Sequence, residues 1–169
     1  MAEDTKDAVA LLKADHREVE DLFEKFEKAS GDGRKQKVAH EICRELTIHA
    51  KIEEEIFYPA CKGKVEDDLL DEAFVEHDAA KLLIAEIEAG EPSDDFYDAK
   101  VKVLKEEIEH HVEEEEKRME GLFSQARKAG VDMESLGQQL AQRKAELMEQ
   151  ISDGPLPEPE LSTMNKASV

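Results

Sequence analysis

Long apolar runs and cysteines are scarce in this sequence, and each of these shortages excludes certain classes of protein. No stretch approaches the roughly 18 consecutive apolar residues that a membrane-spanning helix needs. The first residues lack the basic start and apolar run of a secretory signal. Cys43 and Cys61 form no CxxC motif, and both fall on one expected helix, where a mutual disulfide is out of reach. We therefore expect a cytoplasmic protein with free thiols.

Basic residues are also few, because 23 lysines and arginines face 43 aspartates and glutamates, giving a formal net charge of -20. This charge disfavours direct binding to nucleic acid or to an anionic membrane surface, and it attracts cations. A glycine-rich phosphate loop is missing, and no serine has the patterned histidine neighbour of a nucleophilic triad. We therefore expect neither nucleic acid nor a membrane as a partner, and no motif identifies a protein partner.

Apolar residues recur at alternating spacings of three and four along four segments, which predicts four amphipathic helices. Glycine and proline mark the helix ends. The expected helices span about residues 4–29, 35–61, 66–89 and 94–129. Because short loops join them, they should pack antiparallel. The prediction for residues 1–130 is therefore an all-α fold, an up-down-up-down four-helix bundle.

Two further segments follow the expected bundle. Residues 131–152 are predicted to hold an additional C-terminal helix, because Leu136, Leu140 and Leu147 line one side of it. This helix could cover the bundle or mediate self-association, and the pattern fits both roles. Prolines at positions 155, 157 and 159 cannot continue a helix, so residues 153–169 are predicted to be a flexible tail.

Polar side chains interrupt the apolar stripes of the four bundle helices. Every stripe contains one histidine, and two of these histidines are followed four residues later by a glutamate. Because they share a helix face with the apolar residues, they should point into the interior of the bundle. A buried carboxylate is costly without a partner, and a bound cation supplies one. The candidate metal ligands are His16, His49, Glu53, His77, His111 and Glu115.

The types of donor and their number both bear on the metal. Histidine nitrogen combined with glutamate oxygen suits iron, zinc or manganese, whereas an all-oxygen set would favour calcium or magnesium. Six ligands exceed the four of a tetrahedral zinc site. Two metal ions bridged by the two carboxylates fit the number better.

Two neighbouring histidines compete for one ligand position. On an α-helix His111 and Glu115 lie about 40° apart, whereas His110 and Glu115 lie about 140° apart. His111 also falls in the apolar stripe. We therefore predict that His111 is the ligand and that His110 lies at the surface or contacts a ligand without binding the metal. The alternative is that His110 is the ligand instead. His40 falls off its stripe and is expected at the surface.

An internal repeat relates the two halves of the bundle. When the first helices of the two halves are aligned, His16 matches His77. The HAKIEEEIF segment of the second helix aligns with HVEEEEKRM of the fourth, and this alignment also matches Phe57 with Met119. Each half thus offers one single histidine and one His-x-x-x-Glu pair. The repeat predicts a pseudo-twofold site for two metal ions.

The motifs HAKIEEEIFYP and HHVEEEEKRM, with single histidines in DHREVEDLF and EHDAAKLLI, resemble the hemerythrin-like, or HHE cation-binding, family of four-helix bundles. The likeness covers about residues 8–125. It implies a non-haem di-iron centre between the helices, so the expected cofactor is a pair of iron ions. It also implies that the four histidines are terminal ligands and that Glu53 and Glu115 bridge the irons.

This sequence departs from the oxygen-carrying members of that family at the ligand position after His77, and its final carboxylate follows a histidine by four residues from His111 as well as by the carriers' five from His110. Those carriers have a second histidine four residues after the one matching His77, and here that position is Lys81. A protonated lysine is a poor ligand. The resemblance therefore implies an open position on one iron, unless a nearby glutamate or tyrosine fills it. Both departures count against reversible oxygen carriage.

The leading functional hypothesis is that the chain is a di-iron protein that binds or reacts with dioxygen, peroxide or nitric oxide. Its role would then be oxygen binding, sensing or redox protection. Open coordination favours turnover of peroxide or nitric oxide. An alternative is iron storage, donation or repair, although ferritin-like bundles use Glu-x-x-His motifs and only Glu107 and His110 have that spacing here. A metal-free helical interaction module is disfavoured, because it would leave Glu53 and Glu115 buried without a partner.

Overall fold

The computed structural model describes residues 6–151 and 154–164, and within these ranges the chain is helical without strands. The all-α prediction is confirmed. Residues 1–5, 152–153 and 165–169 lie outside the described residues; the predictions above assign them to the start of the bundle, the end of the additional C-terminal helix and the tail. In chain order the elements are α1 (Ala8–Lys28), α2 (Asp32–Ile52), the π-helix η1 (Glu53–Phe57), α3 (Tyr58–Cys61), α4 (Asp67–Ala89), α5 (Tyr97–Glu116), α6 (Leu122–Lys128) and α7 (Met133–Gln150).

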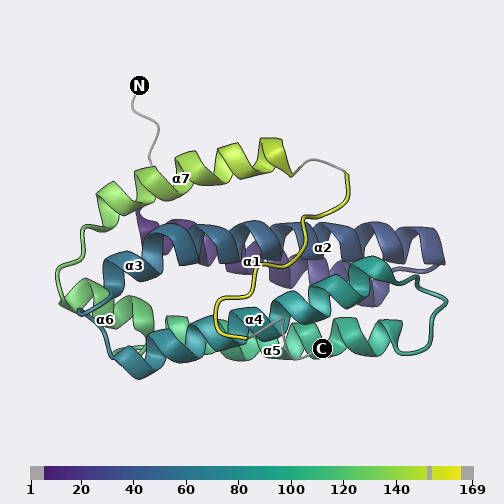
Figure 1. Cartoon of the computed structure of the whole chain (residues 1–169), viewed down its shortest axis with the longest axis horizontal. Helices are drawn as coiled ribbons and strands as arrows, with labels where there is room; N and C mark the ends of the chain where they lie inside the picture. Colours follow the sequence, from purple (N-terminus) through teal and green to yellow (C-terminus); the bar gives the residue numbers. More distant parts are fainter. Residues whose placement is uncertain (1–5, 152–153, 165–169) are drawn as a thin grey trace.

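The bundle is formed by α1, by α2 with its continuation through η1 and α3, by α4 and by α5 (Figure 1). Short loops connect these helices, so neighbours run antiparallel. α7 lies outside the bundle and packs along α1 and α2 (Figure 1). Asp7 caps α1 by accepting the backbone N–H of Ala10 at 2.8 Å, and Asp132 caps α7 by accepting that of Ser135 at 3.0 Å. None of the helices in the described ranges is long and apolar enough to cross a bilayer.

A layer of polar side chains divides the core into two apolar clusters. One cluster includes Leu12 and Phe123 together with residues of α7. The other includes Val19 and Leu104. His16 lies between Leu12 and Val19 along α1, so this histidine marks the boundary between the two clusters. The polar layer therefore has apolar packing on both sides along the bundle.

The fourth expected helix is broken. α5 ends at Glu116, and α6 begins at Leu122 after a turn in which Met119 has a φ of 73°. The apolar stripe predicts that Met119 is buried, but this residue is 65% exposed. A Cβ at Gly121 would lie 2.5 Å from the carbonyl oxygen of Lys117, so this tight turn requires glycine. The prediction of one uninterrupted helix was wrong because it passed over this glycine.

The second bundle helix changes its winding at the polar layer. In η1 the N–H of Tyr58 donates to the carbonyl oxygen of Glu53, five residues earlier, where an α-helix would bond four residues back. The additional residue shifts the buried stripe by one position. Phe57 and Tyr58 are buried, whereas Ile56, three residues after Glu53 and thus at the spacing of the apolar stripe, is only partly buried.

The segment 154–164 lies across the bundle, although its composition predicts a flexible tail. Figure 1 shows it, in yellow, crossing α2 towards α4. Leu156 packs against both apolar clusters. The carboxylate of Asp78 in α4 accepts the backbone N–H groups of Ser162, Thr163 and Met164 at 2.9, 2.6 and 2.9 Å. Prolines exclude a helix here, but they do not reveal contacts with residues that are distant in the sequence.

Candidate metal centre

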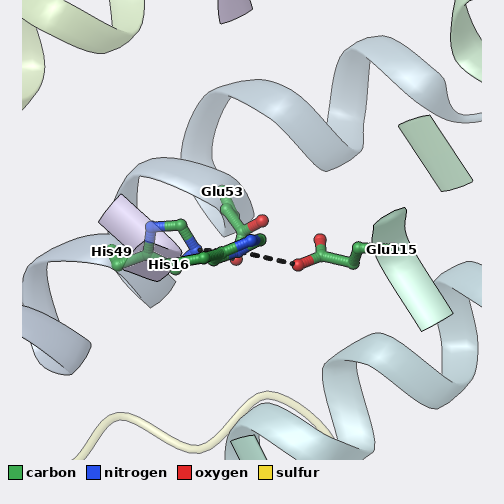
Figure 2. Close-up of side chains that lie close together, drawn as sticks. All are labelled: His16, His49, Glu53 and Glu115. Atoms are coloured by element: carbon green, nitrogen blue, oxygen red, sulfur yellow. Dashed lines mark hydrogen bonds and ion pairs between the residues drawn. The ribbon is translucent and has the colours of Figure 1, made fainter. Parts of the chain in front are cut away.

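The six candidate ligands converge in the polar layer, and all are buried. They form two groups that share Glu53, and the donor atoms within each group lie within 4.8 Å of one another. Four different bundle helices contribute the histidines, while the carboxylates come from η1 and α5. The groups are His16, His49, Glu53 and Glu115, drawn in Figure 2, and Glu53, His77 and His111.

The four imidazoles form two facing pairs. The Nε2 atoms of His16 and His49 lie 3.2 Å apart, and those of His77 and His111 also lie 3.2 Å apart. α1 and α2 supply the first pair, and α4 and α5 supply the second. The pairs therefore match the two halves of the internal repeat.

Each inner carboxylate lies between the two histidine pairs. Oε1 of Glu53 is 3.1 Å from Nε2 of His49 and 3.3 Å from Nε2 of His77. Oε1 of Glu115 contacts the other member of each pair, at 3.4 and 3.2 Å. Both glutamates are thus placed where a carboxylate shared by two metal ions would lie.

A second carboxylate approaches the outer nitrogen, Nδ1, of every imidazole. Burial tends to raise the pKa of Asp15, Glu54 and Glu116, but hydrogen bonds with the histidines outweigh it and lower the pKa of each. An ionised carboxylate only accepts hydrogen bonds, so Nδ1 carries the proton and Nε2 presents its lone pair inwards. The contacts are His16 with Glu116 at 2.7 Å, His49 with Asp15 at 3.0 Å, His77 with Glu54 at 3.1 Å and His111 with Glu76 at 3.0 Å.

A nitrogen-bearing side chain lies beyond each of these outer carboxylates. The four side chains come from four different helices, including α7 outside the bundle. The two lysines and the arginine among them balance the charge of the carboxylates that they contact. The contacts are Lys144 with Asp15 at 2.6 Å, Lys81 with Glu54 at 2.8 Å, Arg17 with Glu116 at 2.5 Å and His110 with Glu76 at 3.5 Å.

The inner donors fit a bound metal better than they fit one another. Facing Nε2 lone pairs have no proton between them in the tautomer that the outer carboxylates favour. Both carboxylate oxygens of Glu53 and Oε1 of Glu115 are buried without a hydrogen-bond partner among the described residues. A buried ion without compensation costs several kcal/mol. Cations placed between the imidazoles and the carboxylates would satisfy both sets of atoms.

The raised pKa values of two ligand histidines reflect the same need for positive charge. Burial lowers the pKa of His49, but Glu53 and Asp15 outweigh it and raise this pKa to about 10. Burial also opposes protonation of His111, yet the neighbouring Glu115 raises its pKa well above the usual value. The carboxylates therefore create a negative potential that favours a proton or a metal ion at the imidazoles.

Tyr58 joins the centre, although the sequence analysis did not select it as a ligand. Its hydroxyl lies 3.0 Å from Oε2 of Glu115 and 3.2 and 3.3 Å from Nε2 of His111 and His77. Residues five apart on an α-helix lie about 140° apart, but the π turn brings Tyr58 to the face of Glu53. The tyrosine of HAKIEEEIFYP was visible in the sequence, whereas the π turn that directs it inwards was not.

Lys81 and His110 both lie outside the inner donor set. The ammonium group of Lys81 lies 2.8 Å from Oε1 of Glu54 and 2.8 Å from the carbonyl oxygen of Glu160. The side chain of His110 is 62% exposed, whereas that of His111 is buried. The hydroxyl of Tyr58 lies beside His77 instead, and tyrosine is one of the two residue types that the sequence left open for this position.

Comparison with known proteins places this arrangement in a family. The model of the hemerythrin HHE cation binding domain matches residues 7–123, which is most of the chain. The chain belongs to the hemerythrin HHE cation-binding family. The match includes all six candidate ligands and Tyr58, and it confirms the family that the sequence motifs resemble.

A solved structure and a curated relative add detail to this hemerythrin-family assignment. The crystal structure of a hemerythrin HHE cation binding domain-containing protein from Mycobacterium kansasii has a TM-score of 0.72 and 24% identity, covering 86% of this chain and 89% of that one. This likeness shows a shared fold. A DNA nickase from Nostoc sp. is 28% identical over 106 residues, which are 63% of this chain. The match spans 30% of the nickase, so most of that protein has no counterpart here.

Proposed function

We propose that this centre holds two iron ions and that it binds or reacts with dioxygen, peroxide or nitric oxide. Each histidine pair would hold one ion, and Glu53 and Glu115 would bind both. The Tyr58 hydroxyl would add a donor beside the pair of His77 and His111. Bound iron would supply redox chemistry towards these small oxidants. The proposal depends above all on the two facing Nε2 pairs with shared carboxylates between them.

The outer residues support a resident centre by holding the ligands in fixed orientations. Each outer carboxylate keeps the proton on Nδ1, fixes the ring and leaves Nε2 free to bind. Apolar clusters pack against the polar layer from both ends of the bundle and hold the helices that carry the ligands. Such a site favours an ion that stays in place, whereas iron storage, donation or repair needs an ion that enters and leaves. We therefore rank iron handling second.

Iron content is the first test of this proposal. The chain is expressed with iron available, purified without chelator and analysed by elemental mass spectrometry. We expect about two iron ions per chain, because two sets of nitrogen and oxygen donors are present. The control is the double variant Glu53→Gln with Glu115→Gln, which keeps all the histidines and should lose the metal. One zinc ion, or no metal after anaerobic loading with ferrous iron, would contradict a di-iron centre.

Reactivity is tested next on the ferrous protein. Samples are mixed without air with dioxygen, hydrogen peroxide or nitric oxide, and the ultraviolet–visible absorption spectrum is followed in time. We expect at least one of the three to change the spectrum, and the double variant to show no such change. If the protein holds iron but reacts with none of them, the oxidant role is rejected. Iron transfer to a metal-free acceptor protein would then test iron handling.

A further inference from the structure

A cavity of about 750 Å³ lies between α2, α4 and the segment 154–164 and reaches the metal centre. All four ligand histidines line it, and residues Pro155 to Ser162 form its outer wall. Pockets that hold organic ligands measure roughly 300–1,000 Å³, whereas one water occupies about 30 Å³. Dioxygen, peroxide or nitric oxide would fill only a small part of this space. The size of the cavity therefore points to a larger occupant.

Apolar side chains line much of this cavity. Val19, Ile84 and Ile108 contribute from the bundle, and Leu156 and Leu161 contribute from the segment that covers it. A ligand with an apolar body gains affinity here because its surface leaves water. The four imidazoles add polar groups where the cavity reaches the metal centre. The cavity thus combines apolar side chains with hydrogen-bonding groups at the centre.

The charges around the cavity select against an anion. Acidic side chains outnumber the lysines of its lining, which are Lys51 and Lys81. Lys81 is already bound to the carboxylate of Glu54 and the carbonyl oxygen of Glu160. Away from the imidazoles, a negatively charged ligand would meet more carboxylates than lysines along the lining. A neutral ligand avoids this repulsion.

The covering segment is held by specific contacts at its far end. The hydroxyl of Ser162 donates to Glu54 at 2.8 Å, and the other oxygen of Glu54 contacts Nδ1 of His77 at 3.1 Å. The hydroxyl of Thr163 donates to Asp78 at 2.6 Å. The outer wall of the cavity is therefore attached to the residues that hold the metal centre. The covering segment is therefore an ordered part of the fold.

We propose that this cavity binds a neutral, apolar organic molecule between the bundle and the segment 154–164, with one end of the molecule at the ligand imidazoles. The lining supplies the apolar surface, the acidic surroundings exclude anions, and the volume admits a molecule of two or more rings or an equivalent chain. This site goes beyond the proposed iron function, and it is open to test in protein without metal.

The test uses the full chain after removal of metal with a chelator. The neutral dye N-phenyl-1-naphthylamine is titrated into the protein, and its fluorescence reports binding. We expect saturable binding of one dye per chain. The sulfonated analogue 1-anilinonaphthalene-8-sulfonate keeps the rings and adds a negative charge, and it should bind on the order of tenfold more weakly or worse.

Substitutions locate the dye in the cavity. Ala80→Trp fills the cavity from α4 and should weaken binding of the neutral dye by on the order of tenfold or more. Leu82→Trp is the matched control, because Leu82 lies on the same helix but is exposed, and it should bind like the parent. Leu161→Glu adds a charge to the covering segment without altering the bundle core, so it tests the same cavity if Ala80→Trp does not fold.

Three results would overturn this proposal. They are the absence of saturable dye binding by the parent, equal affinity for the neutral and sulfonated dyes, and unchanged binding in the folded cavity variants. Histidine side-chain nuclear magnetic resonance spectra test the contact with the centre, since signals of the ligand imidazoles should shift on dye addition while that of His40 stays in place. Because all these measurements use metal-free protein, their failure is distinct from a failure to find iron.

Discussion

The two sides of the metal centre are alike in their inner donors and different in what surrounds them. Both sides have a histidine pair, contacts with both glutamates and carboxylates on the outer nitrogens. On one side the ring of Phe123 stacks over His16, with centroids 6.0 Å apart and planes 10° apart. On the other side the Tyr58 hydroxyl approaches His77 and His111. The repeat thus supplies the ligands, while residues outside the repeat make the two sides unequal.

The basic residues beyond the outer carboxylates extend this difference. On the side of His49, Lys144 of α7 contacts Asp15. On the side of His77, Lys81 contacts Glu54 and also holds the covering segment 154–164. We infer that two bound metal ions would differ in affinity, because only one of them would lie beside the Tyr58 hydroxyl.

The largest expected effect comes from removing a ligand that both sides share. Glu53→Gln replaces the carboxylate that lies against His49 and His77 by a neutral amide. Iron per chain, measured by elemental mass spectrometry, should fall for both ions by on the order of tenfold. Glu113→Gln on the exposed face of α5 is the control and should retain the parent's iron. Full iron content in Glu53→Gln would remove Glu53 from the ligand set.

The next effect should be confined to one side. His111→Ala removes an inner donor of the second pair, so we expect about one iron per chain to remain. His110→Ala is the neighbouring control, and it should keep the parent's iron because its side chain is 62% exposed. The measurement is again metal content after purification without chelator. Loss of metal from His110→Ala with retention by His111→Ala would reverse the assignment of these two residues.

Tyr58→Phe tests the difference between the sides most directly. It removes one hydroxyl beside His77 and His111 and leaves the ring in its packing. One ferrous ion should bind about 10- to 100-fold more weakly, while the other keeps its affinity. Anaerobic titration against a competing chelator measures both affinities. Tyr97→Phe, in the other apolar cluster, should change neither, and equal weakening of both ions by Tyr58→Phe would contradict a one-sided role.

The smallest effects on binding should come from the basic residues beyond the outer carboxylates. Lys144→Met and Lys81→Met should each weaken one ion by less than about tenfold, because they act through a carboxylate and an imidazole. Only Lys81→Met should also loosen the segment 154–164, since it loses the bond to Glu160. Amide hydrogen exchange of this segment, compared between the two variants, distinguishes them. Equal exchange in both would mean that Lys81 does not hold the segment.

The repeating apolar pattern was sufficient to predict the bundle and to bring the six candidate ligands together. A stripe at helical spacing fixes which side chains point inwards, and the four histidines lie within such stripes. His111 was separated from His110 by the same angular argument, and the structure places it in the centre. These features depend on local spacing, which the sequence contains directly.

The features that the sequence analysis missed all interrupt regular spacing. The π turn moved Tyr58 inwards, and the tight turn at Met119 and Gly121 interrupted a helix that the periodicity continued. The docking of residues 154–164 depends on Asp78, which is distant in the sequence and adjacent to a ligand histidine. A pattern of spacing cannot show contacts of this kind, because they arise only after the chain has folded.

The π turn of η1 accommodates one residue more than an α-helical turn would, without breaking the helix. His49, Glu53 and Tyr58 share one face with spacings of four and five residues. Removing one residue between Glu53 and Tyr58 would make both spacings four, so an ordinary α-helix would present the same three side chains. Glu55 is the residue to delete, because its side chain is 37% exposed and contacts Arg143 of α7 at the surface. A deletion variant with parental iron content and helix content would show that the centre tolerates either register.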